Sequence, residues 1–385
     1  MNKQATHNEF LSLIAQGENS AIEFKSINLR PESLAKELVA FSNSNGGVIL
    51  LGVEDSGQIS GIDQSERNLE EWVMNIARNN VIPAISVTLE SLLIEDKTVL
   101  FIRIPKGRDK PYQTLNYLFL IRIGSTNRVA TQAELMRLFQ QSGVFHYDLQ
   151  GVEATALRSL NITKIDQYFS NYQIDFEQED NQPQILINTD ILLESGQTTL
   201  AGLLVFGLNP QKYLYNASIS LARFAGTQIA DALLDKQVIQ GTLDLQIDTA
   251  LAIIKNHIPQ PSHIEGSRTV DSVFQYPDSV FRELLVNACA HRDYSLHGSR
   301  IRIFIFVDRI EFISPGRLPN SVSIEKIKMG VSYARNPVIV KFLENLRYID
   351  KLGRGLPMVY QTAKRAGKQV TFMEVGEEFR VILYF

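Results

Sequence analysis

The fold is decided by one stretch, residues 281–294, which reads Phe281-Arg-Glu-Leu-Leu-Val-Asn-Ala-Cys-Ala-His-Arg-Asp-Tyr294. Glu283, Asn287 and His291 recur four residues apart, so a helix places them in one polar stripe. The residues between them are mainly apolar and must face a core. A polar stripe on such a helix needs a partner, which is either solvent or a ligand. The stretch therefore predicts a core helix with three polar side chains on one face.

Two glycine-containing loops follow this helix. The first, Ser314-Pro-Gly-Arg-Leu-Pro319, comes directly after a predicted strand, and the second, Gly353-Arg-Gly-Leu-Pro357, comes just before a predicted helix. At a helix start, bare backbone amides and the helix dipole favour a phosphate group. A Gly-x-Gly before a helix is by itself typical of ordinary helix-start geometry. The order of the polar helix and the two loops favours a nucleotide site.

This combination resembles the GHKL ATPase superfamily, which includes gyrase, histidine kinases and mismatch-repair proteins. In that family a helix carries Glu-x-x-x-Asn, in which the Glu activates water and the Asn holds the Mg²⁺ that bridges the ATP phosphates. The resemblance implies these roles for Glu283 and Asn287, and it places Gly353, Arg354 and Gly355 around the phosphates. The chemistry is consistent, because an amide oxygen suits a hard cation and a carboxylate one helical turn away can orient water.

A divergent subgroup, labelled RecG-like or putative transcriptional regulator, is a closer resemblance. It has the pattern Arg-Glu-x-Leu-x-Asn-Ala-x-x-His-Arg-Asp-Tyr, then Ser-Pro-Gly-x-Leu-Pro, then Arg-Asn-Pro. The matching segments here are residues 282–294, 314–319 and 335–337, within a similarity that covers roughly residues 195–385. The resemblance adds His291 and Gly316 to the cofactor-binding residues. One feature departs from the superfamily: the Asp that bonds the adenine amino group is missing at Ser314, so the base-recognising residue is unassigned.

The N-terminal part of the chain carries a second set of motifs. They are Gly17-Glu-Asn-Ser-Ala-Ile-Glu-Phe-Lys25, Ala40-Phe-Ser-Asn-Ser-Asn-Gly-Gly47, Leu51-Gly-Val-Glu-Asp-Ser-Gly57, Lys110-Pro-Tyr112 and Ile121-Arg-Ile-Gly-Ser-Thr-Asn-Arg128. Together they resemble the Schlafen-type AlbA-like domain over about residues 8–140. The resemblance implies contact with DNA or RNA. In some eukaryotic Schlafen proteins, two Glu and one Asp of this domain form a metal-dependent RNase centre that acts on tRNA.

Three acids match that centre here: Glu18, Glu23 and Asp55, with Glu54 as a substitute for the third. Three carboxylates can bind a divalent cation and activate water for attack on a phosphodiester. The alternative is structural, since Glu23 can form an ion pair with Lys25 and Asp55 is a common turn former. Both interpretations stay open at the level of sequence.

A local excess of basic residues lies between Val99 and Ala130, where six cations face one acid, Asp109. Aromatic residues lie among them. We expect phosphate contacts from these cations and base stacking on the aromatics. The alternative is a solvated hairpin with ordinary surface charges. With the addition of Lys25, the predicted nucleic-acid-binding residues are Lys25, Arg103, Lys106, Arg108, Lys110, Arg122 and Arg128.

Composition sets the broad class. Hydrophobic residues make up 44% of the 385-residue chain and charged residues 21%, as in folded globular proteins. The net charge of −4 excludes a protein that is basic overall. A single cysteine, Cys289, excludes an internal disulfide and a multi-cysteine zinc site. No apolar run is long enough to cross a bilayer and the first ten residues are polar, so we expect a cytoplasmic protein without a membrane partner.

The element pattern predicts an α+β fold. Expected helices cover residues 7–16, 31–44, a segment around Trp72, 131–141, 242–257, 277–291, 337–346 and 356–366. Expected strands cover residues 21–25, 48–53, 99–104, 117–123, 199–206, 217–224, 300–307, 309–313 and 370–385. The predicted domains are an AlbA/Schlafen-like domain (1–142), a mixed connecting segment (143–264) and a GHKL-like α/β sandwich (265–385).

These observations predict an ATP- and Mg²⁺-binding regulatory protein that also binds nucleic acid, with nucleotide in the C-terminal pocket modulating DNA or RNA engagement. The alternative is a metal-dependent endoribonuclease acting on tRNA or other structured RNA, in stress or phage defence. Because GHKL proteins frequently dimerise, the resemblance also implies a homodimer.

Overall fold

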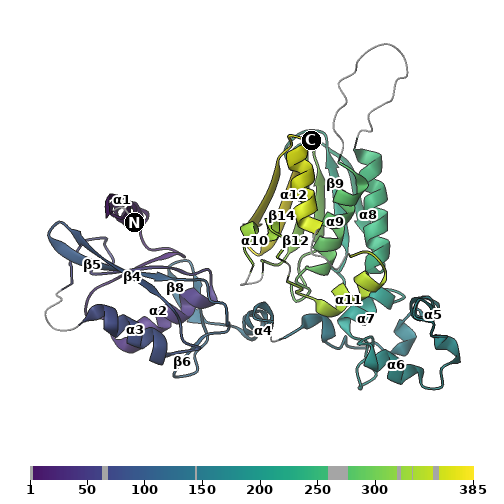
Figure 1. Cartoon of the computed structure of the whole chain (residues 1–385), viewed down its shortest axis with the longest axis horizontal. Helices are drawn as coiled ribbons and strands as arrows, with labels where there is room; N and C mark the ends of the chain where they lie inside the picture. The colour runs from purple at the N-terminus through teal and green to yellow at the C-terminus, as the bar shows by residue number, and fades with distance from the viewer. Residues whose placement is uncertain are drawn as a thin grey trace, which may run out of the picture. The chain divides into compact units, whose positions relative to one another are not determined.

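The computed structural model describes residues 3–62, 68–143, 145–258, 276–318, 322–331, 333–349 and 355–385 (Figure 1). The predicted phosphate-loop residues Gly353 and Arg354 lie outside the described residues. The chain forms two compact units, the N-terminal unit (residues 1–145) and the C-terminal unit (residues 146–385). Each contains helices and sheets, which confirms the predicted α+β class.

The N-terminal unit is built on a four-stranded sheet of order β1-β2-β5-β4, in which β1 and β2 are parallel and the other pairs antiparallel. Its elements are α1 (Lys3–Gln16), β1 (Ile22–Lys25), α2 (Pro31–Asn43), β2 (Gly47–Leu51), α3 (Leu69–Asn79), β3 (Val81–Ile82), β4 (Thr88–Ile94), β5 (Lys97–Ile104), β6 (Gln113–Thr114), β7 (Leu120–Ile123), β8 (Thr126–Val129) and α4 (Gln132–Gln141).

Local chemistry explains the α2–β2 connection. Pro31 stands in the first turn of α2, where its missing N–H costs nothing. After the helix, Gly46 has φ +77°, and a Cβ on it would come within 2.5 Å of the Ile104 carbonyl oxygen. Only glycine fits this turn, which brings β2 directly beside β5.

The two strands predicted around residues 99–104 and 117–123 do not pair with each other as the strands of one hairpin. β5 pairs with β2 and β4, whereas β7 pairs with β8 in a separate two-stranded sheet. The intervening segment includes β6, which pairs with β3. Two strands separated by turn residues look like a hairpin in sequence, but non-local pairing decided the partners here.

The C-terminal unit is built on a six-stranded sheet of order β10-β9-β11-β12-β14-β13, with β9 and β11 parallel and the other pairs antiparallel. Its elements are α5 (Ile162–Ser170), α6 (Gln182–Asn188), α7 (Leu200–Phe206), β9 (Ile219–Phe224), β10 (Leu233–Ile239), α8 (Leu243–His257), α9 (Asp278–Ala290), β11 (Ile301–Ile305), β12 (Arg309–Pro315), α10 (Ile324–Lys328), α11 (Pro337–Asn345), α12 (Gly355–Arg365), β13 (Val370–Val375) and β14 (Glu378–Tyr384). Helices α8, α9 and α12 lie side by side over the sheet, with α9 in the middle (Figure 1).

The segment predicted as a strand at residues 199–206 is a helix, α7. Thr199 caps it by accepting a hydrogen bond from the Gly202 N–H at 2.9 Å, and every residue from Leu200 to Phe206 is buried. A short apolar run cannot be assigned to strand or helix by periodicity alone. Here the Thr199 cap stabilises the start of a helix that is buried on all sides.

One hydrophobic core extends from Val152 to Leu383 and includes residues of α5, α7, α8, α9, α11 and the six-stranded sheet. The segment predicted to connect the two domains therefore shares its core with the C-terminal section. Among the described helices, none has the length and apolar character needed to cross a membrane.

Candidate functional site

A cavity of about 600 Å³ opens between α9, the end of β12, α10, α11 and the start of α12. The structure brings together there all the predicted cofactor-binding residues that it describes. They are Glu283, Asn287 and His291 from α9 and its C-cap, Gly316 after β12, and Gly355 at the start of α12. The remaining wall is mainly apolar, with Leu284, Phe312, Ile327, Val340 and Met358 among its residues.

The helical spacing of Glu283 and Asn287 produces a direct contact. The Asn287 Nδ2 donates to the Glu283 backbone carbonyl at 2.8 Å and to its Oε1 at 2.5 Å. Both bonds use the amide nitrogen, so the amide oxygen is directed away from Glu283. No described residue donates a hydrogen bond to that oxygen. An oriented amide oxygen in a cavity fits a hard cation such as Mg²⁺.

Gly355 touches the same carboxylate. A Cβ at Gly355 would lie only 1.6 Å from Oε1 of Glu283, so no other residue fits without moving Glu283. Gly355, the first residue of α12, therefore presents bare backbone to the cavity beside the Glu283–Asn287 pair. A helix start with exposed amides attracts anions, which fits a phosphate group.

The loop after β12 is locked to the end of α9. Gly316 has φ +111°, and a Cβ there would come within 2.7 Å of the Asp293 Cβ. The Asp293 N–H donates to the Pro315 carbonyl at 2.7 Å, and the Ser314 hydroxyl donates to the Ala288 carbonyl at 3.0 Å. This close approach explains why the loop requires glycine.

Sequence reasoning missed one cavity residue with a structural role. Arg335 forms an ion pair with Asp293 at 2.7 Å, with 4% and 5% of the two side chains exposed. The adjacent Asn336 donates to the carbonyls of Ala290 and Arg292 at 2.9 and 2.8 Å. In the sequence, only the Arg-Asn-Pro motif points to this contact, and its partners lie more than 40 residues away at the end of α9.

His291 is neutral at physiological pH. Burial and the nearby Arg335 cation lower the pKa of His291 to about 4. A neutral imidazole does not attract phosphate as a cation would, but it can exchange hydrogen bonds with a base or a sugar hydroxyl.

Asp148 links the beginning of the C-terminal unit to a wall of the cavity. Its buried Oδ2 accepts hydrogen bonds from the Val338 and Ile339 N–H groups at 2.7 and 3.1 Å, at the start of α11. Val340 and Glu344 of the same helix line the cavity. Burial raises the pKa of Asp148 despite these bonds.

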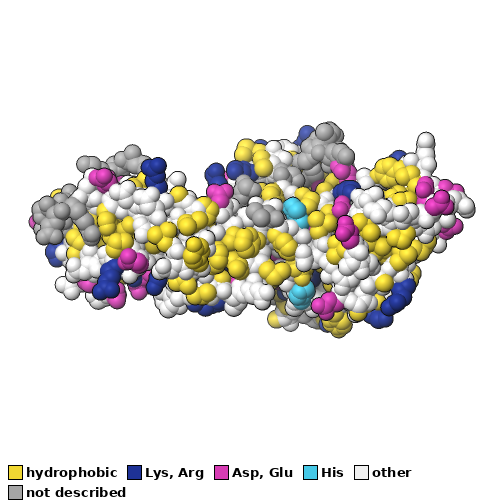
Figure 2. All heavy atoms as spheres, turned by 90° about the horizontal axis from the view of Figure 1, so that it is seen from below, with side chains coloured by type: hydrophobic (Ala, Val, Ile, Leu, Met, Phe, Trp, Pro, Cys, Tyr) yellow, Lys and Arg dark blue, Asp and Glu magenta, His cyan; other side chains and the backbone are white. Residues whose placement is uncertain are grey.

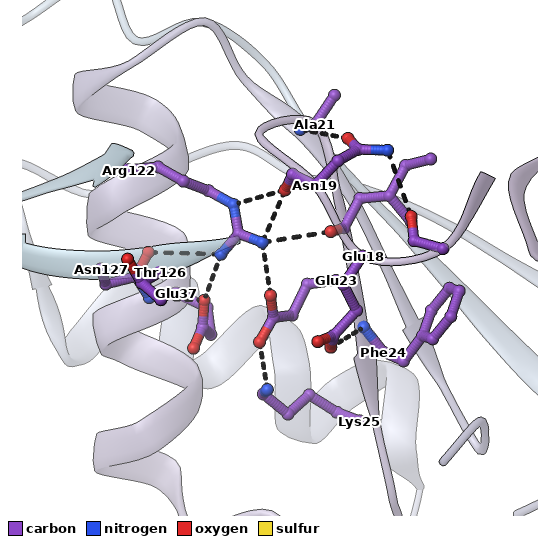
Figure 3. Close-up of polar contacts among 12 residues, drawn as sticks. Glu18, Asn19, Ala21, Glu23, Phe24, Lys25, Glu37, Arg122, Thr126 and Asn127 are labelled. Atoms are coloured by element: carbon purple, nitrogen blue, oxygen red, sulfur yellow. Dashed lines mark hydrogen bonds and ion pairs between the residues drawn. The ribbon is translucent and has the colours of Figure 1, made fainter. Parts of the chain in front are cut away.

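In the N-terminal unit, one of the predicted acids, Glu23, lies in an ion-pair network around Arg122 (Figure 3). The Arg122 side chain is 1% exposed and contacts Glu23 at 2.5 Å and Glu37 at 3.4 Å. It also donates to the Asn19 carbonyl at 2.8 and 3.0 Å and lies 4.4 Å from the centre of the Phe41 ring. Lys25 pairs with the second oxygen of Glu23.

The other two predicted acids have different surroundings. Glu18 accepts a hydrogen bond from the Phe24 N–H at 3.0 Å, and Asp55 is exposed in the turn after β2. Among the described residues, no group of three His, Cys, Asp or Glu side chains is arranged to hold a metal ion. The contacts of Glu23 agree with its structural interpretation, and a nuclease centre stays a prediction.

Most of the predicted nucleic-acid-binding cations are paired. Arg103 forms a bidentate bond with Glu9, both contacts at 2.8 Å, and Arg128 pairs with Glu134 at 2.7 Å. Lys110 is buried and donates to the Ser44 carbonyl at 2.7 Å. Lys106 is half-buried and Arg108 is exposed. On the face drawn in Figure 2, Lys and Arg side chains are scattered among Asp and Glu and form no continuous basic stripe.

Two family matches agree with this division. Residues 18–131 match the family described as Schlafen, AlbA_2, and residues 298–383 match the family described as putative ATP-dependent DNA helicase recG C-terminal. Both resemblances expected from the motifs are thereby confirmed. No curated protein matches the chain in sequence.

Two solved structures are similar. The DIP2311 protein from Corynebacterium diphtheriae is 21% identical over 99% of this chain and 70% of its own, with a TM-score of 0.46. The N-terminal domain of a putative ATP-dependent DNA helicase RecG-related protein from Nitrosomonas europaea is 24% identical over 32% of this chain and 92% of its own, with a TM-score of 0.24.

Proposed function

Because the chain carries a Schlafen AlbA_2 domain followed by a HATPase-type domain of the RecG C-terminal family, we propose that it is an ATP-binding, nucleic-acid-binding regulatory protein. Nucleotide in the C-terminal cavity alters how the protein engages DNA or RNA in the cytoplasm. The observation that carries the proposal is the convergence of Glu283, Asn287 and Gly355 on one cavity.

The cavity offers a different environment at each end of a nucleotide. Its apolar wall and the neutral His291 suit a base and a sugar. The Gly355 backbone at the start of α12 suits a phosphate, and the Asn287 amide oxygen suits Mg²⁺. When bound, Mg²⁺ would neutralise the charge of the phosphate oxygens. Glu283 orients the Asn287 amide and lies within reach of a water beside the terminal phosphate.

Isothermal titration with ATP and Mg²⁺ tests the proposal. Wild-type protein is expected to release binding heat, and Asn287→Ala is expected to bind at least about tenfold more weakly, which corresponds to about 1.4 kcal/mol. Asn171→Ala, an exposed asparagine at the C-cap of α5, is the matched control and should bind as wild type does. No binding heat for the wild type, or the same ATP affinity for Asn287→Ala as for the wild type, would contradict the proposal.

Coupling between nucleotide and nucleic acid needs a second measurement. The affinity for a labelled DNA or RNA oligonucleotide is measured with and without saturating ATP and Mg²⁺. A regulatory role requires the two affinities to differ, and reciprocity requires the oligonucleotide to shift the ATP affinity by the same factor. If the oligonucleotide affinity is the same with and without ATP, the protein binds nucleotide and nucleic acid independently, and a regulatory role is ruled out.

The endoribonuclease alternative places a physical demand on the N-terminal unit. Glu23 would have to leave Arg122 and Lys25 before its carboxylate could hold a cation. Separating a buried ion pair leaves an uncompensated charge, at a cost of about 3–5 kcal/mol. Binding of nucleic acid without cleavage needs no such rearrangement, which favours a non-catalytic role for this unit.

A further inference from the structure

One tyrosine of the C-terminal unit is unusually exposed and has a cation against one face. Tyr215 is 71% exposed, and the Arg300 guanidinium carbon lies 5.6 Å from the centre of its ring. A cation over the face of an aromatic ring is attracted by the electrons of that ring. The high exposure leaves most of the rest of the ring in contact with solvent.

The backbone that carries Tyr215 is held in place by Arg292. This buried arginine donates to the Asn216 carbonyl and to the Ser299 carbonyl, each at 2.7 Å, and so ties two surface loops together. Arg300 donates to the Asn216 side-chain oxygen at 2.7 Å. These bonds hold the backbone next to Tyr215 and the Arg300 guanidinium in place.

More positive charge lies along the same loop. The Lys212 ammonium lies 5.4 Å from the centre of the Tyr213 ring, and the Tyr213 hydroxyl contacts Ser159 at 3.4 Å. A hydrogen bond from Ser159 and the charges of Lys212 and Arg158 all lower the pKa of Tyr213, so both cations act on this ring. We call Arg158, Lys212, Tyr213, Tyr215 and Arg300 the tyrosine–arginine patch.

The cations of the patch lack the carboxylate partners that two of the predicted nucleic-acid-binding arginines have. No described carboxylate lies within 4.0 Å of Arg158, Lys212 or Arg300, whereas Arg103 and Arg128 of the N-terminal unit are neutralised by Glu9 and Glu134. An arginine or lysine without a carboxylate partner can neutralise a phosphate without first breaking an ion pair.

We infer that the tyrosine–arginine patch binds single-stranded nucleic acid. Its unpaired cations follow the phosphate backbone, and a base stacks on the exposed Tyr215 ring, the combination used by single-strand-binding surfaces. An acidic protein would use the cations but would have no need for the open ring face. The inference deepens the nucleic-acid-binding part of the proposed function and rests on it, while locating a contact outside the AlbA-type unit.

The test measures fluorescence anisotropy of labelled oligo(dT) and oligo(U) strands of about 20 nucleotides with the full chain, at several salt concentrations. Tyr215→Ala is expected to weaken binding roughly tenfold, and Tyr215→Trp to restore it. Arg300→Ala and Lys212→Ala should each reduce the slope of log K against log salt by about 0.7. Arg300→Lys, which keeps the charge, should keep the slope.

Matched controls come from the same unit. Tyr172→Ala removes a tyrosine that is 49% exposed, and Lys364→Ala removes an exposed lysine in the last turn of α12; neither should change the affinity. Thermal unfolding of each variant checks that it is folded. Wild-type binding that is unaffected by the patch variants would overturn the inference and leave the proposed function standing. No binding by the wild type would overturn both, and equally strong competition by polyglutamate would assign the patch to acidic proteins and overturn it.

Discussion

At the scale of single residues, the contact between Gly355 and Glu283 carries a sharp prediction. In Gly355→Ala, the new methyl group must displace the Glu283 carboxylate, because the space between them is already filled. The carboxylate is the free end of a flexible side chain, so the free energy of unfolding should change by less than about 1 kcal/mol. The hydrogen bond to Asn287 is lost, and the ATP affinity measured with Mg²⁺ should fall roughly tenfold.

Gly298→Ala is the control for that variant. A Cβ at Gly298 meets no atom within 4 Å, so the substitution adds the same methyl group in open space. It should leave both unfolding in urea and ATP titration unchanged. An ATP affinity of Gly355→Ala equal to that of wild type would mean that Glu283 does not position Asn287 for the ligand.

Some cavity residues are placed by the geometry of a single helix, and others by contacts between distant parts of the chain. Glu283, Asn287 and His291 could be predicted because the helical period alone puts them on one face. The Arg335–Asp293 ion pair could not, since its members are far apart in sequence and meet only after α11 packs beside α9. The pairing of Arg122 with Glu23 could not be predicted for the same reason, because the two residues are 99 positions apart. The ion pair of Glu23 with Lys25, two positions away, could be inferred from the sequence and is present.

At the scale of elements, helix α4 begins with a capping box. The Thr131 hydroxyl accepts from the Glu134 N–H at 3.3 Å, while the Glu134 carboxylate accepts from the Thr131 N–H at 2.8 Å and pairs with Arg128. The Arg128 hydrogen bond, joined by those from Thr131, lowers the pKa of Glu134 to about 2. The carboxylate therefore stabilises the folded chain when it is ionised.

A pH dependence follows from this shift. Because the folded pKa lies below the usual 4.5, the contribution is complete above about pH 4.5 and is lost as the pH falls towards 2. After allowance for solvent screening of the exposed Arg128 partner, we expect about 1 kcal/mol. Urea unfolding of wild type and Glu134→Gln should differ by this amount at neutral pH and converge only as the pH falls below about 2. A difference that persists unchanged at low pH would contradict the assignment.

Most helices and strands could be predicted because caps, prolines and glycines mark their ends locally. Pro31, Thr131 and Pro337 each stand where a helix begins. The strand prediction for residues 199–206 was wrong because a segment buried on all sides lacks the apolar periodicity that distinguishes a helix from a strand. The pairing partners of β5 and β7 could not be predicted, because strand pairing depends on contacts far along the chain.

At the scale of the whole molecule, the edge strand β10 bears on the proposed homodimer. β10 ends the six-stranded sheet, and Leu233, Leu234 and Val238 on it are 52%, 56% and 46% exposed. Proteins usually cover or charge such an edge, because it is a template for another strand. The pattern Leu-Leu-Asp-Lys-Gln-Val-Ile is apolar at both ends, so an antiparallel copy centred on Lys236 places Leu234 opposite Val238, with the two Lys236 side chains as the like charges that face each other in the wild type.

We therefore expect the wild-type chain to have the mass of a dimer in light scattering at micromolar concentration. A Leu234→Lys, Val238→Lys double variant should be a monomer, because like charges then face each other across the symmetric pair. Leu245→Lys, an equally exposed leucine on α8, should remain dimeric. A monomeric wild type, or a dimeric double variant, would rule out this edge as the interface.

Asp148 has a mechanical consequence. It stands three residues after the N-terminal unit ends, and its side chain holds the first turn of α11, whose Val340 and Glu344 line the cavity. The position of this cavity wall therefore depends on one carboxylate that lies close in sequence to the boundary between the two units.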